Sequence, residues 1–122
     1  KNKLKLCGYV KDINTLINTL DLNILPSAGE AFPNIIGETM SLGVLSIGTN
    51  VGDISEIIGN HGWVIEKSDS KLLAKTIIKA KKEYMKKDEW NKKCLKAKER
   101  IEKKYPINLM IDKYYSIWSN NN

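Results

Sequence analysis

The chain has 122 residues, of which 42% are hydrophobic and 28% are charged, and its formal net charge is +6. This composition is typical of a soluble folded protein, and the length allows one domain at most. No apolar run approaches the roughly 18 residues of a membrane span, so we expect no membrane-spanning segment. The first six residues also lack the long apolar core of a secretory signal.

The positive charge is concentrated in the second half of the chain. Residues 67–104 hold 15 of the 20 Lys and Arg but only 6 of the 14 Asp and Glu. Such a stretch can bind anionic lipid or nucleic acid. Lysine is frequent along the whole chain, however, and here it falls on the polar sides of amphipathic helices. We therefore favour a solvated lysine face over a peripheral contact with an anionic membrane, and we expect no nucleic-acid partner.

The first elements in chain order are a predicted strand and a predicted helix. Residues 4–8 read as a short strand ending in Gly8, and Tyr9, Val10 and Lys11 form the loop that follows. Asp12 is the expected cap of a helix over residues 13–20, whose apolar residues fall on one face.

The stretch DLNILPSAGEAFPNIIGETMSLG, residues 21–43, predicts a strand, a tight loop and a helix. Residues 22–25 have the length of a buried strand, and Pro26 ends it. Asn34 is the expected N-cap of a helix that Gly43 terminates. In open α/β sheets this junction lies at the carboxyl end of a strand, where ligands bind. The helix start offers free N–H groups and a positive dipole end, which suit a phosphate.

The remaining elements continue the alternation of strands and helices and then become wholly helical. We expect a strand over residues 44–47, a helix over residues 54–58 capped by Asp53, and a strand over residues 63–65. From Asp69 onward the pattern predicts only helices, with a second helix capped at Asp88, a break at 105–106 and a last helix from about Asn108. The chain is thus a single domain with an α/β part, residues 1–66, and C-terminal helices, residues 67–122. We expect the aromatic residues of these helices to lie in the core rather than to stack on a ligand, and an exposed Tyr115 or Trp118 would instead suit the surface of a missing partner.

Cysteine and histidine give no sign of a metal or redox site. Cys7 in the predicted strand and Cys94 on a helix are too far apart for a Cys-x-x-Cys motif, so both read as small buried residues. His61 stands alone between Asn60 and Gly62, as a turn residue does. We therefore predict no metal site.

Two glutamates flank the loop before the central helix. Glu30 lies in the loop and Glu38 about one helical turn beyond Asn34. Carboxylates accept hydrogen bonds, so both could bind the hydroxyls of a sugar or ribose above the helix start. On spacing alone, a solvated loop acid and a solvated helix acid remain the favoured interpretation.

The surrounding blocks favour the site. Residues 21–27 read DLNILPS, residues 30–33 read EAFP and residues 38–43 read ETMSLG, with VLSIGTNVG following at residues 44–52. In this order the blocks resemble the donor-binding, C-terminal half of retaining glycosyltransferases of the GT-B architecture, in the group 1 family with its Glu-x7-Glu motif.

The sequence departs from the family pattern at two positions. Ala31 replaces a glycine, which costs stability if the position needs φ > 0, and Asp53 replaces the second glycine of a pair. We interpret Asp53 as a helix cap, with Glu56 at capping-box spacing.

The resemblance implies a fold and a set of roles. The fold is a partial Rossmann-like sheet of about four parallel strands with helices on both faces and a helical C-terminal third. Glu30 lies at the catalytic centre beside the sugar ring, next to Ala31, and Glu38 binds the ribose. The backbone near Val10 contacts the base, although an ordinary strand-to-helix turn explains this segment equally well. The diphosphate is held by the backbone N–H groups of the segment Phe32, Pro33, Asn34 and Ile35.

The reaction implied is transfer of a hexose from a nucleoside diphosphate sugar to an acceptor hydroxyl, in carbohydrate biosynthesis, with no cofactor beyond the donor. The basic residues that neutralise the diphosphate and the acceptor site belong to parts of the family fold that precede Lys1, so we expect this fragment alone to be inactive. We expect such a protein to lie in the cytoplasm, either free or at the cytoplasmic face of the membrane. The alternatives are a non-catalytic nucleotide-sugar-binding module and a basic domain that binds a membrane or nucleic acid.

The same resemblance predicts an unpaired sheet edge. The family order 3-2-1-4-5-6 would give this chain strands 3, 4, 5 and 6, so residues 22–25 lack their neighbour. Either residues 4–8 slide in beside them, or the edge is closed by a second copy or by the missing N-terminal half. We favour closure of the edge by association with another chain, because placing residues 4–8 beside residues 22–25 would disturb the packing of the helices.

Overall fold

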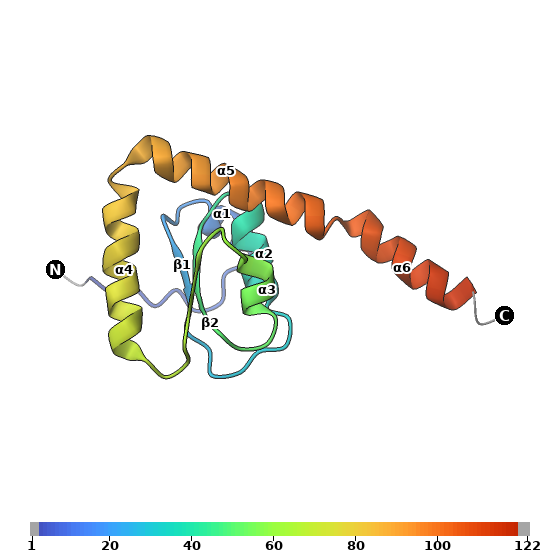
Figure 1. Cartoon of the computed structure of the whole chain (residues 1–122), viewed down its shortest axis with the longest axis horizontal. Coiled ribbons are helices and arrows are strands. Elements are labelled where there is room, and N and C mark those ends of the chain that lie inside the picture. Colours follow the sequence, from blue (N-terminus) through green and yellow to red (C-terminus); the bar gives the residue numbers. More distant parts are fainter. Residues whose placement is uncertain (1–2, 120–122) are drawn as a thin grey trace.

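The structure, a computed structural model, describes residues 3–119 (Figure 1). In chain order its elements are α1 (Ile13–Ile17), β1 (Asn23–Leu25), α2 (Asn34–Ser41), β2 (Ser46–Thr49), α3 (Ile54–Ile58), β3 (Trp63–Ile65), α4 (Ser70–Tyr84), α5 (Lys87–Lys104) and α6 (Ile107–Ser119). The predicted α/β class with a helical C-terminal part is confirmed.

The sheet has three parallel strands in the order β1-β2-β3. Ile24 pairs with Ile47, and Gly48 pairs with Val64. All four residues of the central strand β2 are buried. Because parallel strands run side by side in one direction, the loops that follow them gather at one edge of the sheet.

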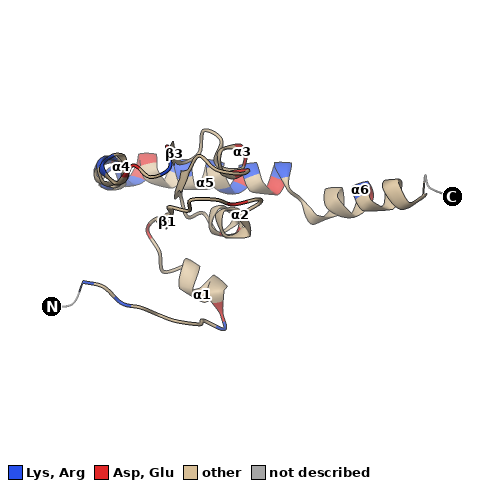
Figure 2. Ribbon diagram, turned by 90° about the horizontal axis from the view of Figure 1, so that it is seen from below, with Lys and Arg blue, Asp and Glu red and all other residues tan. Residues whose placement is uncertain are grey.

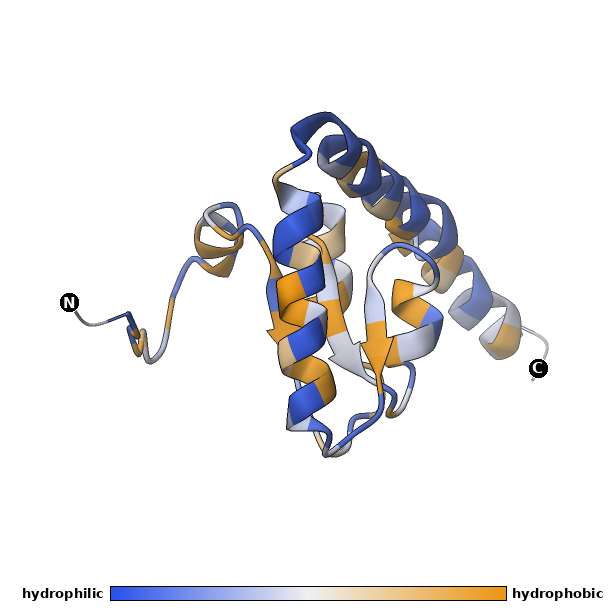
Figure 3. Ribbon diagram, turned by 60° about the vertical axis from the view of Figure 1, so that its left-hand side comes forward, coloured by the Kyte–Doolittle hydropathy of each residue, from blue (hydrophilic) through white to orange (hydrophobic). Residues whose placement is uncertain are grey.

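Helices cover both faces of the sheet, as predicted. On one face, Ile47 and Ile65 pack against Ala80 of α4. On the other, α2 and α3 pack beneath α5, and Figure 3 shows α5 with a mostly hydrophilic outer surface. Gly48 permits this packing, since a Cβ there would lie 2.5 Å from the Cγ2 atom of Ile54. A glycine on β2 therefore lets α3 approach the sheet closely.

Arg100 joins α5 to the end of α3. Its Nε donates to the carbonyl oxygen of Ile57 at 2.9 Å and its Nη2 to that of Glu56 at 2.6 Å. These carbonyls belong to the last turn of α3 and have no partner within the helix, so the guanidinium caps them. The adjacent Gly59, at φ 54°, leaves room for it, because a Cβ there would lie 2.6 Å from Cζ of Arg100.

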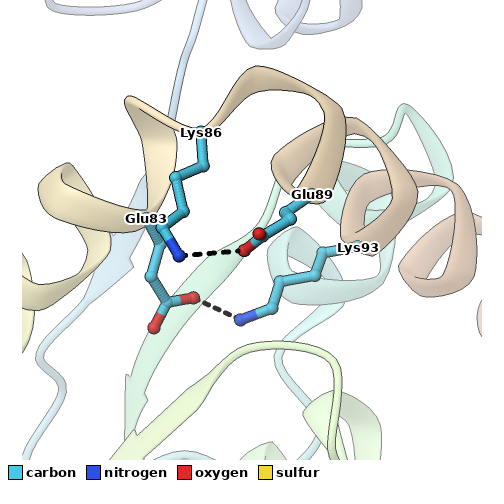
Figure 4. Close-up of polar contacts among 4 residues, drawn as sticks. All are labelled: Glu83, Lys86, Glu89 and Lys93. Carbon is cyan, nitrogen blue, oxygen red and sulfur yellow. Dashed lines mark hydrogen bonds and ion pairs between the residues drawn. The ribbon is translucent and has the colours of Figure 1, made fainter.

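The corner between α4 and α5 carries ion pairs on its surface and aromatic rings beneath them. Figure 4 shows Lys93 pairing with Glu83, and Lys86 with Glu89 at 3.4 Å. Exposed pairs of this kind contribute roughly 0–1 kcal/mol each. Trp90 is 5% exposed and its ring contacts the rings of Trp63 and Tyr84, so aromatic packing stabilises the corner more than the ion pairs do.

The predicted strand over residues 4–8 is wrong, and the sheet therefore has three strands instead of about four. Residues 3–12 form no strand, Leu6 is 87% exposed and Cys7 is exposed instead of buried. Figure 2 shows this segment running past α1, away from the sheet. A strand needs a neighbour for its backbone hydrogen bonds, and this segment has none. The alternative in which it slides in beside β1 is not what the structure adopts.

Several predicted boundaries also shift. The first helix ends at Ile17 rather than 20, and the central strand begins at Ser46 rather than 44. Pro33 occupies the cap position of α2 and Asn34 is its first helical residue, without a side-chain cap bond. Asp53 stands at the start of α3 but makes no cap bond either. Asp88 lies inside the first turn of α5 instead of capping it.

The expected burial of the last aromatic residues is wrong as well. No residue of α6 is buried, and Trp118 is 69% exposed. Figure 1 shows α6 extending away from the body of the molecule beyond the break at Pro106. Within residues 3–119, no helix combines the length and the apolar character that a membrane span requires.

Candidate functional site

The candidate site lies at the carboxyl edge of the sheet, where the loops after the three strands meet. Thr49, the last residue of β2, donates its hydroxyl proton to the carbonyl oxygen of Ser27, at 2.6 Å. The backbone N–H of Asn50 donates to the carbonyl oxygen of Ile65 at 2.7 Å. These two bonds tie the loop after β2 to the loops after both neighbouring strands. The edge is thus a connected surface built from distant parts of the chain.

The loop that precedes α2 is held closely from one side. The backbone N–H of Asp53 donates to the carbonyl oxygen of Ala31 at 2.9 Å. Gly52, at φ 51°, leaves no space for a Cβ, which would lie 2.5 Å from that same oxygen and closer still to the carbonyl oxygen of Glu30. A backbone-to-backbone contact therefore fixes the position of residues 30–31.

Ala31 does not carry the strain that its replacement of a glycine suggested. Ser68 is the one non-glycine residue within 3–119 that has positive φ. Ala31 is therefore in ordinary backbone conformation, and the reason to expect a stability penalty at this position is removed.

Both glutamates of the motif are exposed to solvent. Glu30 lies in the loop, where its Oε1 accepts a hydrogen bond from the hydroxyl of Ser27 at 2.7 Å. Glu38 lies in the second turn of α2, and its carboxylate forms no hydrogen bond or ion pair with any part of the chain that the structure describes. Both carboxylates are thus available to accept hydrogen bonds from a ligand.

The start of α2 offers backbone donors beside these carboxylates. The N–H of Ile36 donates to the carbonyl oxygen of Pro33 at 3.1 Å, which closes the first turn. The N–H groups of Asn34 and Ile35 have no acceptor among residues 3–119. Pro33 has no N–H, so this member of the predicted diphosphate-binding segment can contribute only shape. Two unpaired donors at a helix start are suited to an anion.

A small hollow of about 220 Å³ opens at the same edge, between the loops and the start of α4. Asp69 caps α4 by accepting a hydrogen bond from the N–H of Leu72 at 2.8 Å. The hollow is lined by Pro26, Thr49, Ile65, Glu66, Ser68, Asp69, Ser70 and Leu73. Polar groups and the ends of all three strands surround it, as is common where α/β sheets bind ligands.

Val10 is the one predicted site residue that lies outside this cluster. It is half-buried in the irregular segment before α1, and within residues 3–119 it forms no hydrogen bond to the loops described above. The residues that sequence reasoning missed are Thr49 and Ser27, which lock two loops together. Ser27 stands in the block at residues 21–27 and Thr49 in the block at residues 44–52, but nothing local in the sequence indicates that the two form a hydrogen bond.

The remaining chemically active side chains lie away from the edge. Burial raises the pKa of the half-buried Cys94 thiol, and burial with the charges of Arg100 and Lys96 lowers the pKa of His61. His61 sits in a turn, as predicted. In the part of the chain that the structure describes, no three His, Cys, Asp or Glu side chains lie together as metal ligands would.

Comparison with known proteins shows which family this chain belongs to. The crystal structure of a glycosyltransferase from Rickettsia africae ESF-5 is similar, with a TM-score of 0.90 and 29% sequence identity. The match covers 98% of this chain and 32% of that chain, so this chain spans about a third of its length. No protein with a curated description matches. Residues 1–83 match the family described as Glycosyl transferases group 1, and the chain therefore belongs to the group 1 glycosyltransferases.

Proposed function

We propose that this chain is the donor-binding part of a retaining glycosyltransferase of the GT-B architecture. The parent reaction is transfer of a hexose from a nucleoside diphosphate sugar to an acceptor hydroxyl. The observation that carries the proposal is the placement of Glu30 and Glu38 on either side of a clamped loop, beside the free N–H groups of Asn34 and Ile35.

Each group has a task that its chemistry suits. Glu38 accepts hydrogen bonds from the two ribose hydroxyls, and Glu30 accepts them from the hexose. The N–H groups at the start of α2 hold the diphosphate, aided by the helix dipole. Donors fixed in this way stabilise the charge that develops on the leaving diphosphate without a metal ion. Val10 contacts the base through its backbone, if residues 3–12 fold back when the donor binds.

Partners outside the chain complete the proposal. The match to about a third of a longer glycosyltransferase leads us to assign donor binding to this chain and transfer itself to a longer polypeptide. The bare apolar face of α6 and the free edge of β1 suit contact with that remainder, in the cytoplasm. Figure 2 shows Lys and Arg residues, with some acids between them, along α4 and α5, and these basic residues would suit a peripheral contact with an anionic membrane.

Donor binding is tested by following backbone amide signals by NMR while UDP and GDP are added, with uridine and guanosine as controls that keep the base and ribose but lack the diphosphate. We expect shifts at residues 30–38 with at least one diphosphate. Glu38→Gln should weaken binding by about 10- to 100-fold, the equivalent of roughly 1.5–3 kcal/mol for a hydrogen bond to a charged group.

The matched control is Glu102→Gln, a glutamate on the exposed side of α5 that pairs with Lys98 at 3.9 Å. It should leave binding unchanged. Shifts confined to the lysine-rich helices α4 and α5, with residues 30–38 unaffected, would overturn the site. Binding to anionic vesicles that salt abolishes, with no response to either diphosphate, would instead support the basic interaction domain.

A further inference from the structure

The donor loop is supported on a second side by an aromatic ring from the far end of the chain. The rings of Phe32 and Tyr105 lie edge to face, with 5.8 Å between their centroids and 71° between their planes. Phe32 belongs to the loop and is 48% exposed, whereas Tyr105 directly follows α5. This contact joins residues 73 positions apart in the sequence.

Tyr105 is itself fixed to the body of the molecule. Its ring packs against the core cluster that contains Ile36, Met40 and Ile101. Its backbone N–H donates to the carbonyl oxygen of Ile101 at 2.9 Å, which closes the last turn of α5. The ring is therefore a rigid surface against which the loop can rest.

The hydroxyl of Tyr105 does not explain why a tyrosine stands here. The oxygen is buried, and no group within residues 3–119 forms a hydrogen bond with it. A buried hydroxyl without a partner costs free energy, so the aromatic ring is the useful part of the side chain. Phenylalanine should serve equally well.

The ring contact acts next to the anion-binding donors. Phe32 precedes Pro33, which occupies the cap position of α2, and the free N–H groups of Asn34 and Ile35 follow at once. Gly52 and Asp53 hold the loop at residues 30–31, and the ring of Phe32 against Tyr105 supports it again between that clamp and the helix. Moving this ring changes the angle at which the loop enters α2.

We propose that Tyr105 is a positioning residue for the donor site, which orients the loop at residues 31–35 through the ring of Phe32. The proposal rests on the proposed donor binding for its functional consequence, but the effect on the loop itself does not need a ligand. Edge-to-face pairs contribute modestly, so loss of the ring should weaken diphosphate binding by about three- to tenfold.

The test compares Tyr105→Leu, Tyr105→Phe and the control Tyr84→Leu. Tyr84 makes a similar edge-to-face contact with Trp90, at 5.3 Å and 84°, away from the donor loop. We expect Tyr105→Leu to shift or broaden the ligand-free amide signals of residues 31–35 and to weaken UDP or GDP binding. Tyr105→Phe should preserve both the signals and the affinity. Tyr84→Leu should lower the unfolding midpoint and leave the loop signals in place.

Unchanged loop signals in Tyr105→Leu, or equal changes in Tyr84→Leu, would overturn the proposal. If neither diphosphate binds the wild-type chain, donor binding is wrong, and the ligand-free signals alone still decide the role of Tyr105. Should Tyr105→Leu not fold, Phe32→Leu removes the same contact from a half-exposed position. Phe32→Leu should shift the amide signals of residues 33–35, and unchanged signals would refute the proposal.

Discussion

Gly52→Ala tests whether the backbone clamp on the donor loop is real. A Cβ at this position would lie 2.5 Å from the carbonyl oxygen of Ala31, where real Cβ contacts essentially never fall below 3.0 Å. Either the loop moves or Gly52 leaves φ 51°, and both changes break the bond from the N–H of Asp53 to Ala31. Left-handed backbone costs an alanine roughly 1–2 kcal/mol, and the lost hydrogen bond about 1 kcal/mol more.

We therefore expect Gly52→Ala to lower the free energy of unfolding by about 2–3 kcal/mol, measured by urea denaturation. The amide of Asp53 should exchange faster with solvent. The matched control is Gly37→Ala, inside α2, where a Cβ meets nothing within 4 Å and φ is not positive. That change should raise stability by about 0.5–1 kcal/mol. A loss below about 0.5 kcal/mol for Gly52→Ala, with Asp53 still protected, would refute the clamp.

Three further predictions concern the core, pH and the sheet edge. Met40→Ala should cost about 2–5 kcal/mol in urea denaturation, because this side chain of α2 is 0% exposed; a cost under 1 kcal/mol would show that α2 is loosely packed. Since the pKa of His61 is lowered, the unfolded chain binds its proton more tightly, so stability should fall as pH drops below about 6.5. His61→Asn should reduce the difference between the free energies of unfolding measured by urea denaturation at pH 7.5 and pH 5.5. A difference equal to that of the wild type would contradict this prediction. The free edge of β1 should lead the chain to associate at micromolar concentration; light scattering after gel filtration that finds only a monomer with a cooperative melt would exclude this.

The sequence predicted those elements whose signals are local. The helix ending at Gly43 was predicted because glycine alone readily takes φ 77° there. Asp12 was predicted as the cap of α1, and its Oδ1 accepts a hydrogen bond from the N–H of Thr15, three positions on, at 3.1 Å. The cap of α2 was misplaced by one residue, since Pro33, with extended backbone at φ −78° and ψ 98°, occupies the cap position and offers no side-chain bond.

For the candidate site too, the residues with a local sequence pattern were predicted and the contacts between distant residues were not. Glu30 and Glu38 lie within one continuous motif, so their pattern was readable in the chain. The contacts that hold the loop come from Thr49, Gly52 and Tyr105, which are 21 or more positions away from the groups that they touch. A single sequence gives each of these residues an ordinary local explanation as a strand end, a turn glycine or a helix end. Only the fold shows that they converge on one loop.

The two largest errors, at residues 4–8 and in α6, have opposite structural outcomes for one physical reason. Both segments are apolar and both are exposed in the structure. The hydrogen bonds of a helix lie within the segment itself, so α6 forms although its apolar face is bare. The hydrogen bonds of a strand lie in a neighbour, so residues 4–8 stay irregular when no neighbour is present. An apolar pattern therefore predicts only that a segment is suited to burial. Whether the segment forms regular structure before it is buried depends on whether its backbone hydrogen-bond partners lie within the segment or in a neighbouring strand.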